Sequence, residues 1–134
     1  MPAVDAAALL ASIGRAPGPG AWRILDARSP ERYRGEAEPI DPVAGRIPGA
    51  INRFHRENLQ ADGRFKEPAV LRAEFARLGI DAEAAAGVAH QCGSGVTACH
   101  NLLAMAHAGL AGSALYPGSW SEWCADAARP LERG

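Results

Sequence analysis

Short apolar runs alternate along the chain with segments whose apolar residues recur every three or four positions. The runs at residues 22–26, 50–52, 87–89 and 114–116 predict buried strands. Helical spacing predicts helices at residues 6–13, 30–34, 68–78, 98–110 and from 119 onward, with short helical turns at 54–60 and 81–86. Such alternation is typical of α/β proteins. We therefore expect one domain over residues 1–134, with a central, mostly parallel β-sheet and helices on both faces.

Helix ends are predicted from the residues that cap them. Asp5 is a suitable N-cap for the first helix, and Gly14 is a suitable stop. Ser119 and Glu122 have the spacing of a capping box, so we expect Ser119 to cap the last helix. The proline- and glycine-rich residues 16–20 predict a loop.

The helix over residues 98–110 has an apolar side that predicts its buried face. The positions expected to face the core are Cys99, Leu102, Leu103, Ala106 and Leu110. On this basis Cys99 is expected to be a packed core residue. His100 and His107 lie on the polar side, seven residues apart. Because metal-binding pairs on a helix usually lie four residues apart, we expect both to face solvent.

Composition and charge exclude several classes of function. A formal net charge of −1 argues against a nucleic-acid binder or a basic membrane-surface protein. No apolar run approaches the roughly 20 residues that span a bilayer, and no signal-peptide pattern is present. The three cysteines form no CxxC pair, which suggests neither a disulfide framework nor a zinc site. We expect a cytoplasmic protein without a metal or an organic cofactor.

The segment around Cys92 carries the clearest chemical signal. A predicted strand leads to Cys92, Gly93 and Gly95 follow within three residues, and a predicted helix then begins. Glycines allow positive φ, so consecutive N–H groups can converge on one point, and the helix start adds unpaired N–H groups. Both effects favour thiolate over thiol. The pattern predicts a nucleophilic cysteine, although free cysteines are also common in cores.

Charged residues are expected at the same edge of the sheet. Sites in open parallel sheets form at the carboxyl ends of the strands, where both Asp26 and Cys92 are predicted to lie. Arg28 and Arg32 follow Asp26, and guanidinium groups bind carboxylates and oxyanions bidentately. We expect Arg28 to form a structural ion pair, with Asp26 or another acid, and Arg32 to bind an anionic substrate.

Four segments in order along the chain resemble the rhodanese family of sulfurtransferases. They are residues 25–35, 45–52, 92–97 and 118–123. The resemblance implies an α/β, rhodanese-like three-layer fold. More narrowly, the chain is similar to the C-terminal, catalytic half of tandem thiosulfate/3-mercaptopyruvate sulfurtransferases. An N-terminal rhodanese domain precedes that half, and it is the partner domain that the resemblance implies.

The resemblance also implies roles for individual residues. Cys92 would carry a persulfide, cradled by the backbone N–H groups of Gly93, Ser94, Gly95, Val96 and Thr97. Arg32 matches the arginine that binds the substrate anion, and Ser94 matches the loop serine that delivers a proton. Asp26 and Arg28 are expected to support the site. Animal mercaptopyruvate enzymes have a second arginine near Ile40, where this chain has none.

The expected reaction is sulfur transfer from a small anionic donor to a thiophilic acceptor through a Cys92 persulfide. The donor would be 3-mercaptopyruvate or thiosulfate, and the acceptor cyanide or a thiol. Gly93 and Ser94 make the loop neutral, which favours mercaptopyruvate over the thiosulfate dianion. Two alternatives remain. One is a cysteine phosphatase, which is disfavoured because Ala98 stands where a phosphatase needs an arginine. The other is a binding, regulatory or persulfide-relay module, which is disfavoured because such modules often lack the cysteine that this chain retains.

Overall fold

A four-stranded sheet forms the centre of the computed structural model, which describes residues 2–16 and 21–134. The strands are β1 (Arg23–Asp26), β2 (Ile51–Asn52), β3 (Val88–Gln91) and β4 (Ala114–Leu115). They lie in the order β2-β1-β3-β4, and each neighbouring pair is parallel. The predicted α/β fold with a parallel sheet is therefore confirmed. Since Asp26 pairs with Gln91, the carboxyl ends of β1 and β3 lie side by side.

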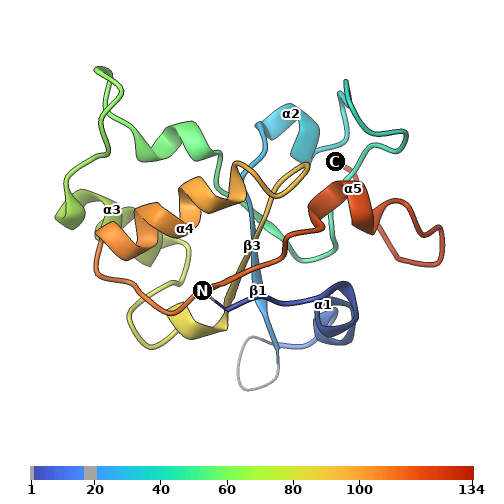
Figure 1. Ribbon diagram of the computed structural model, residues 1–134, viewed down its shortest axis with the longest axis horizontal. Helices are drawn as coiled ribbons and strands as arrows, with labels where there is room; N and C mark the ends of the chain where they lie inside the picture. The colour runs from blue at the N-terminus through green and yellow to red at the C-terminus, as the bar shows by residue number, and fades with distance from the viewer. Residues whose placement is uncertain (1, 17–20) are drawn as a thin grey trace.

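Helices cover the sheet on both sides (Figure 1). They are α1 (Ala6–Ser12), α2 (Pro30–Tyr33), α3 (Pro68–Arg77), α4 (Ala98–His107) and α5 (Ser119–Trp123), with 3₁₀ turns η1 (His55–Asn58) and η2 (Ala85–Gly87). Helices α3 and α4 lie on one side, and α1 and α5 lie on the other. The short helical turn expected at residues 81–86 appears as a turn followed by η2, and it stays short of an α-helix because so few residues close few helical hydrogen bonds. Of the loop expected at 16–20, residues 17–20 lie outside the described residues.

The two central strands are buried on both faces. Ile24 of β1 and Ala89 of β3 belong to the core that α1 and α5 cover, whereas Leu25 and Val88 belong to the core beneath α3 and α4. Successive strand residues point to opposite faces of a sheet, so each strand contributes to both cores. This is why the apolar residues of these strands stand next to each other in the sequence, Ile24 with Leu25 and Val88 with Ala89, and do not alternate with polar ones.

The buried face of α4 differs from the prediction. Cys99 is exposed and Leu103 is 55% exposed, although Leu110, beyond the helix end, is buried as expected. The residues that α4 buries are Ala98, Asn101, Ala104 and Met105. The prediction was wrong because alanines carry little hydrophobic signal and asparagine carries none. Asn101 can be buried because its Nδ2 donates to the Arg53 carbonyl oxygen at 2.8 Å.

The two predicted helix caps have different outcomes. Asp5 caps α1, since its Oδ1 accepts a hydrogen bond from the Ala8 N–H at 2.8 Å. Ser119 is instead the first residue of α5 and makes no side-chain cap. Glu122 accepts a hydrogen bond from the Tyr116 hydroxyl at 2.7 Å. The capping-box prediction is therefore wrong, and both side chains have other partners.

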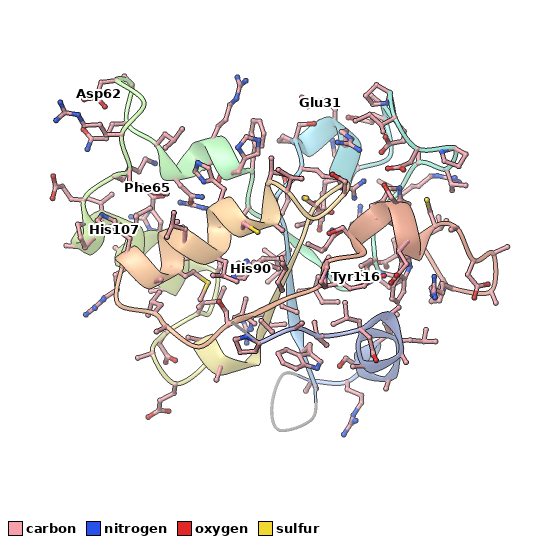
Figure 2. All side chains as sticks on the ribbon, in the orientation of Figure 1. Glu31, Asp62, Phe65, His90, His107 and Tyr116 are labelled. Atoms are coloured by element: carbon pink, nitrogen blue, oxygen red, sulfur yellow. The ribbon has the colours of Figure 1, made fainter. Side chains whose placement is uncertain are left out.

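A histidine lies in the interior of the fold. His90 on β3 is fully buried, and its Nε2 lies 3.1 Å from Ser113 Oγ (Figure 2). Within the described residues, its Nδ1 has no hydrogen-bond partner. Burial lowers the pKa of His90 from 6.5 to about 4, because the charged imidazolium loses its hydration.

We predict that His90 makes the fold less stable in mild acid. The unfolded chain protonates this residue near its ordinary pKa of 6.5, whereas the folded chain does so only near pH 4. The free energy of unfolding should therefore be unaffected above that ordinary value and fall as the pH decreases from 6.5 to about 4. The loss should total roughly 3 kcal/mol, measured by urea unfolding at several pH values.

His90→Gln is the control for this prediction, because it removes the titrating ring while retaining a polar side chain next to Ser113. It should lose most of the pH dependence in that window. The same acid-induced loss in both proteins would assign it to other groups.

Candidate active site

Cys92 follows β3 directly and borders a pocket. The residue is 1% exposed and packs with Ala27 and Ala98. The pocket has a volume of about 200 Å³ and is lined by Arg32, Ile40, Asp41, Cys92, Gly93, Ser94, Val96, Thr97 and Ser121. The structure therefore brings the cysteine, most of the loop behind it and the expected substrate arginine to one place.

The loop after Cys92 brings one backbone N–H group to the sulfur and leaves others without an acceptor among the described residues. The Gly95 N–H donates to Cys92 Sγ at 3.0 Å. Gly95 has a φ of +94°, and a Cβ there would lie 2.5 Å from the Pro117 carbonyl oxygen, so only glycine fits. The N–H groups of Gly93, Ser94, Val96 and Thr97 donate to no acceptor among the described residues. Their residues line the same pocket as the sulfur, so these donors are available to an anion there.

Ser119 positions the backbone of the cysteine. It is fully buried with a φ of +55°, which is unusual for a residue with a side chain. Its Oγ accepts a hydrogen bond from the Cys92 N–H at 3.0 Å and donates one to the Tyr116 carbonyl oxygen at 3.0 Å. Sequence reasoning missed this role because the same spacing is typical of a capping box.

Arg32 reaches the loop from α2. A Cβ on Gly93 would lie 3.0 Å from Arg32 Nη2, so the guanidinium lies directly against the loop backbone. Its Nε and Nη2 donate to the two carboxylate oxygens of Glu38 at 3.3 and 3.0 Å. Its Nη2 also lies 3.6 Å from Asp41 Oδ2. Glu38 thus binds the basic group that lines the pocket, and Asp41 lies close to it.

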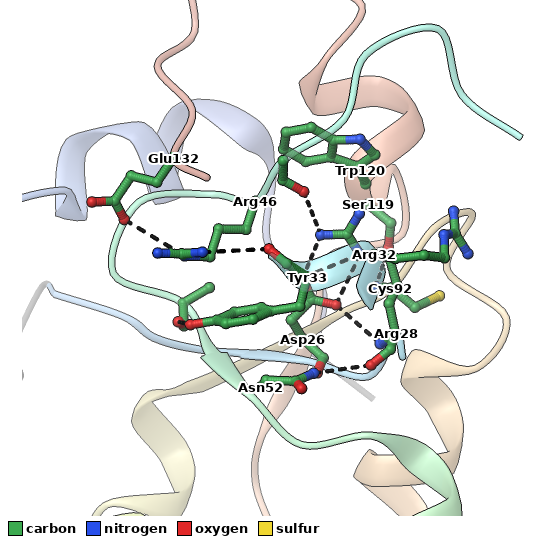
Figure 3. Close-up of polar contacts among 12 residues, drawn as sticks. Asp26, Arg28, Arg32, Tyr33, Arg46, Asn52, Cys92, Ser119, Trp120 and Glu132 are labelled. Atoms are coloured by element: carbon green, nitrogen blue, oxygen red, sulfur yellow. Dashed lines mark hydrogen bonds and ion pairs between the residues drawn. The ribbon is translucent and has the colours of Figure 1, made fainter. Parts of the chain in front are cut away.

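Asp26 and Arg28 lie behind the pocket and do not line it. Both are buried, and Arg28 Nη2 lies 2.7 Å from Asp26 Oδ2 (Figure 3). The same Nη2 donates to the Gly45 carbonyl oxygen at 2.8 Å, and the guanidinium carbon lies 5.0 Å from the centre of the Trp120 ring. This pair holds together the segments that carry β1 and α5.

Glu38 connects the two arginines. Its Oε1 lies 3.5 Å from Arg28 Nη1, and both of its oxygens bind Arg32. Burial would raise the pKa of Glu38, but hydrogen bonds from the N–H groups of Asp41 and Ile40 and from Arg32 outweigh it and keep that pKa below its ordinary value. Glu38 is therefore a negative charge that lies behind the pocket, next to Arg32.

Sequence reasoning missed Asp41 and Ser121, which line the pocket, and Glu38, which lies behind it. The segment that carries the two acids, residues 36–49, has neither a helical nor a strand period. Its acids are placed by hydrogen bonds to Arg32 and Ser121, and no sequence pattern records such contacts. The proximity of two acids to Arg32 in the sequence was the one available signal.

The two histidines of α4 both pack against Phe65 but differ in exposure. His107 is exposed as expected. The expectation for His100 is wrong, because the residue is half-buried, with its ring centroid 5.4 Å from that of His55 and 5.1 Å from that of Phe65. Burial lowers the pKa of both His55 and His100. Within residues 2–16 and 21–134, no group of three or more histidine, cysteine or acidic residues could hold a metal ion.

No helix in the described part of the chain has both the length and the apolar character needed to cross a membrane.

Known proteins similar to this chain are sulfurtransferases. The chain is 50% identical over 131 residues to the probable 3-mercaptopyruvate sulfurtransferase of Pseudomonas aeruginosa, which covers 98% of this chain and 44% of that protein. It is 37% identical over 105 residues to the thiosulfate sulfurtransferase of Mus musculus, covering 76% and 35%. The chain thus spans less than half the length of the curated relatives it matches.

The fold agrees with these sequence relationships. The crystal structure of an anaerobic ergothioneine biosynthesis enzyme from Chlorobium limicola superposes with a TM-score of 0.84 at 25% identity, covering 98% of this chain and 32% of that one. Residues 6–126 match the family model described as a rhodanese-like domain. Because this match includes the whole sheet, the Cys92 loop and α5, the chain belongs to the rhodanese-like domain family.

Proposed function

We propose that this chain transfers sulfane sulfur through a persulfide on Cys92. The observation that carries the proposal is the set of backbone N–H groups at the pocket, of which that of Gly95 already binds Sγ. Such a set stabilises a negative sulfur both in the thiolate and in the persulfide. The names of the relatives, for 3-mercaptopyruvate and for thiosulfate, support the same reaction class.

In the first half-reaction, the Cys92 thiolate attacks the sulfur of 3-mercaptopyruvate. A sulfur–sulfur bond forms as the carbon–sulfur bond breaks, and the electron pair of that bond leaves with pyruvate as its enolate. The enolate needs one proton, which we assign to Ser94, an exposed residue of the pocket wall. Arg32 holds the carboxylate of the donor. With thiosulfate, sulfite leaves with the bonding pair and needs no proton on carbon.

In the second half-reaction, a thiophilic acceptor attacks the outer sulfur of the persulfide. The sulfur–sulfur bond breaks, and its electron pair returns to Cys92 as the thiolate. Cyanide and thiols have the required nucleophilicity. The loop amides stabilise the same negative sulfur at the start and at the end of the cycle.

We propose 3-mercaptopyruvate as the preferred donor. Gly93 and Ser94 bring no positive charge to the loop, and Arg32 is bound by Glu38 and faces Asp41. A dianion such as thiosulfate would favour more positive charge than this pocket offers.

We further propose that the chain works as the catalytic half of a longer, two-domain protein. The share of its relatives that it spans, 44% of the Pseudomonas aeruginosa protein, supports this arrangement. The boundary of one domain at residues 1–134 and a cytoplasmic location stay predictions.

We predict that Cys92→Ser abolishes sulfur transfer. Serine offers no thiolate, so turnover with either donor and cyanide should fall by about a thousandfold or more. Intact-protein mass spectrometry after mixing with donor should show one added sulfur atom on the wild type and none on the variant. Cys99→Ser is the matched control, because Cys99 is exposed on α4 and does not line the pocket. Absence of any adduct on the wild type would favour a binding module.

We predict that Ser94→Ala affects the two donors differently. Loss of the proposed proton donor should lower kcat for mercaptopyruvate by at least about tenfold, because its enolate must be protonated. Turnover of thiosulfate should change less than about threefold, because sulfite leaves without a proton on carbon. Steady-state assays measure kcat of the variant and of the wild type with each donor. Equal losses of kcat for the two donors would show that Ser94 supports the loop structure and does not deliver the proton.

We predict that Ser119→Ala destabilises the protein by about 1–3 kcal/mol. The substitution leaves the buried Cys92 N–H without its acceptor at 3.0 Å. Urea unfolding measures the change, and Ser94→Ala should shift it by less than about 0.5 kcal/mol because that side chain is exposed. A stability of Ser119→Ala equal to that of the wild type would contradict the assigned role.

A further inference from the structure

The pocket beside Cys92 is lined by charges of both signs. Arg32 is its cation, and the two nearest acids are Glu38 and Asp41, at 3.0 and 3.6 Å from Arg32 Nη2. Behind them, Asp26 and Arg28 form an ion pair at 2.7 Å, and their formal charges cancel. The sum of the formal charges over these five side chains is therefore −1. An arginine expected to bind an anion is thus outnumbered by carboxylates.

Glu38 and Asp41 differ in how completely their charges are paired. Glu38 binds both Nε and Nη2 of Arg32 and also accepts the N–H groups of Ile40 and Asp41 at 3.1 Å. Its charge is matched by Arg32, and it holds the turn that leads to Asp41. Glu38 does not line the pocket.

Asp41 lines the pocket and is incompletely paired. Its Oδ1 accepts a hydrogen bond from Ser121 Oγ at 2.7 Å. Its Oδ2 is buried and has no hydrogen-bond donor within the described residues. The nearest cation is Arg32 at 3.6 Å, beyond hydrogen-bond length, and the Asp41 side chain is only 9% exposed. Water and salt therefore screen this charge weakly, and its negative potential extends into the pocket.

We propose that Asp41 is a specificity-determining residue that discriminates against dianionic sulfur donors in favour of monoanionic ones. The inference rests on the proposed function of Cys92. A fixed negative charge repels a donor in proportion to the charge of that donor, so thiosulfate is repelled twice as strongly as 3-mercaptopyruvate. Asp41 acts through the electrostatic potential of the pocket and takes no part in making or breaking bonds.

The test is Asp41→Asn, which removes the charge and retains an oxygen for the Ser121 hydroxyl. Because the repulsion doubles with donor charge, the fold-increase in kcat/KM for thiosulfate should be the square of that for mercaptopyruvate. An increase of about threefold for mercaptopyruvate should accompany about tenfold for thiosulfate. Asp41→Ser, a second neutral variant, should shift the donor ratio in the same direction.

Two control variants separate the effect of the charge at position 41 from a general structural effect of substitution. Asp41→Glu keeps the charge and should restore a donor ratio close to that of the wild type. Asp62→Asn makes the same chemical change on an exposed loop away from the pocket (Figure 2) and should leave both kcat/KM values unchanged. Equal changes for both donors in Asp41→Asn and Asp41→Ser, or a fall in the thiosulfate value relative to that of mercaptopyruvate, would overturn the inference.

Failure of the proposed function gives a different result. If the wild type forms no persulfide on Cys92 with either donor, the proposed function fails and the inference fails with it. If the wild type forms the persulfide and the donor ratio does not respond to the charge at position 41, the inference alone fails.

Discussion

The first turn of α5 holds the Cys92 loop in place, and the site depends on this contact. The N–H groups of Trp120 and Ser121 donate to the carbonyl oxygens of Cys92 and Gly93, each at 2.9 Å, while Ser119 Oγ accepts the Cys92 N–H at 3.0 Å. These three hydrogen bonds fix the backbone of Cys92 and Gly93, where the loop begins. The loop that carries the sulfur is therefore positioned partly by a helix nearly thirty residues further along the chain.

A second constraint is a chain of ion pairs that begins behind the pocket and ends at the two charged residues that line it, Arg32 and Asp41. It runs from Asp26 through Arg28, Glu38 and Arg32 to Asp41, with buried or partly buried members throughout. Buried charges are costly unless they are paired, so each member restricts where its neighbours can lie. This is how a segment without helical or strand period acquires a defined structure and places a carboxylate beside the sulfur site.

Sequence reasoning succeeded where the information is local. Each central strand contains adjacent apolar residues that mark it in the sequence, and the glycines after Cys92 indicate a tight loop between a strand and a helix. It failed where burial depends on partners. Asn101 is buried because Arg53 and Asn58 complete its hydrogen bonds, whereas Leu103, a stronger hydrophobic signal, is exposed. Ser119 has a capping-box spacing, yet its hydroxyl binds Cys92 and Tyr116.

The sequence by itself determined the α/β class, the position of the cysteine at the end of a strand and the presence of glycines that allow positive φ in the loop after it. These properties depend on residues within a few positions of one another. The tertiary structure alone decided which side of α4 is buried, which hydroxyl supports the cysteine and which acids surround Arg32. Those outcomes depend on hydrogen bonds and ion pairs between distant segments, and such contacts exist only once the sheet has brought the segments together.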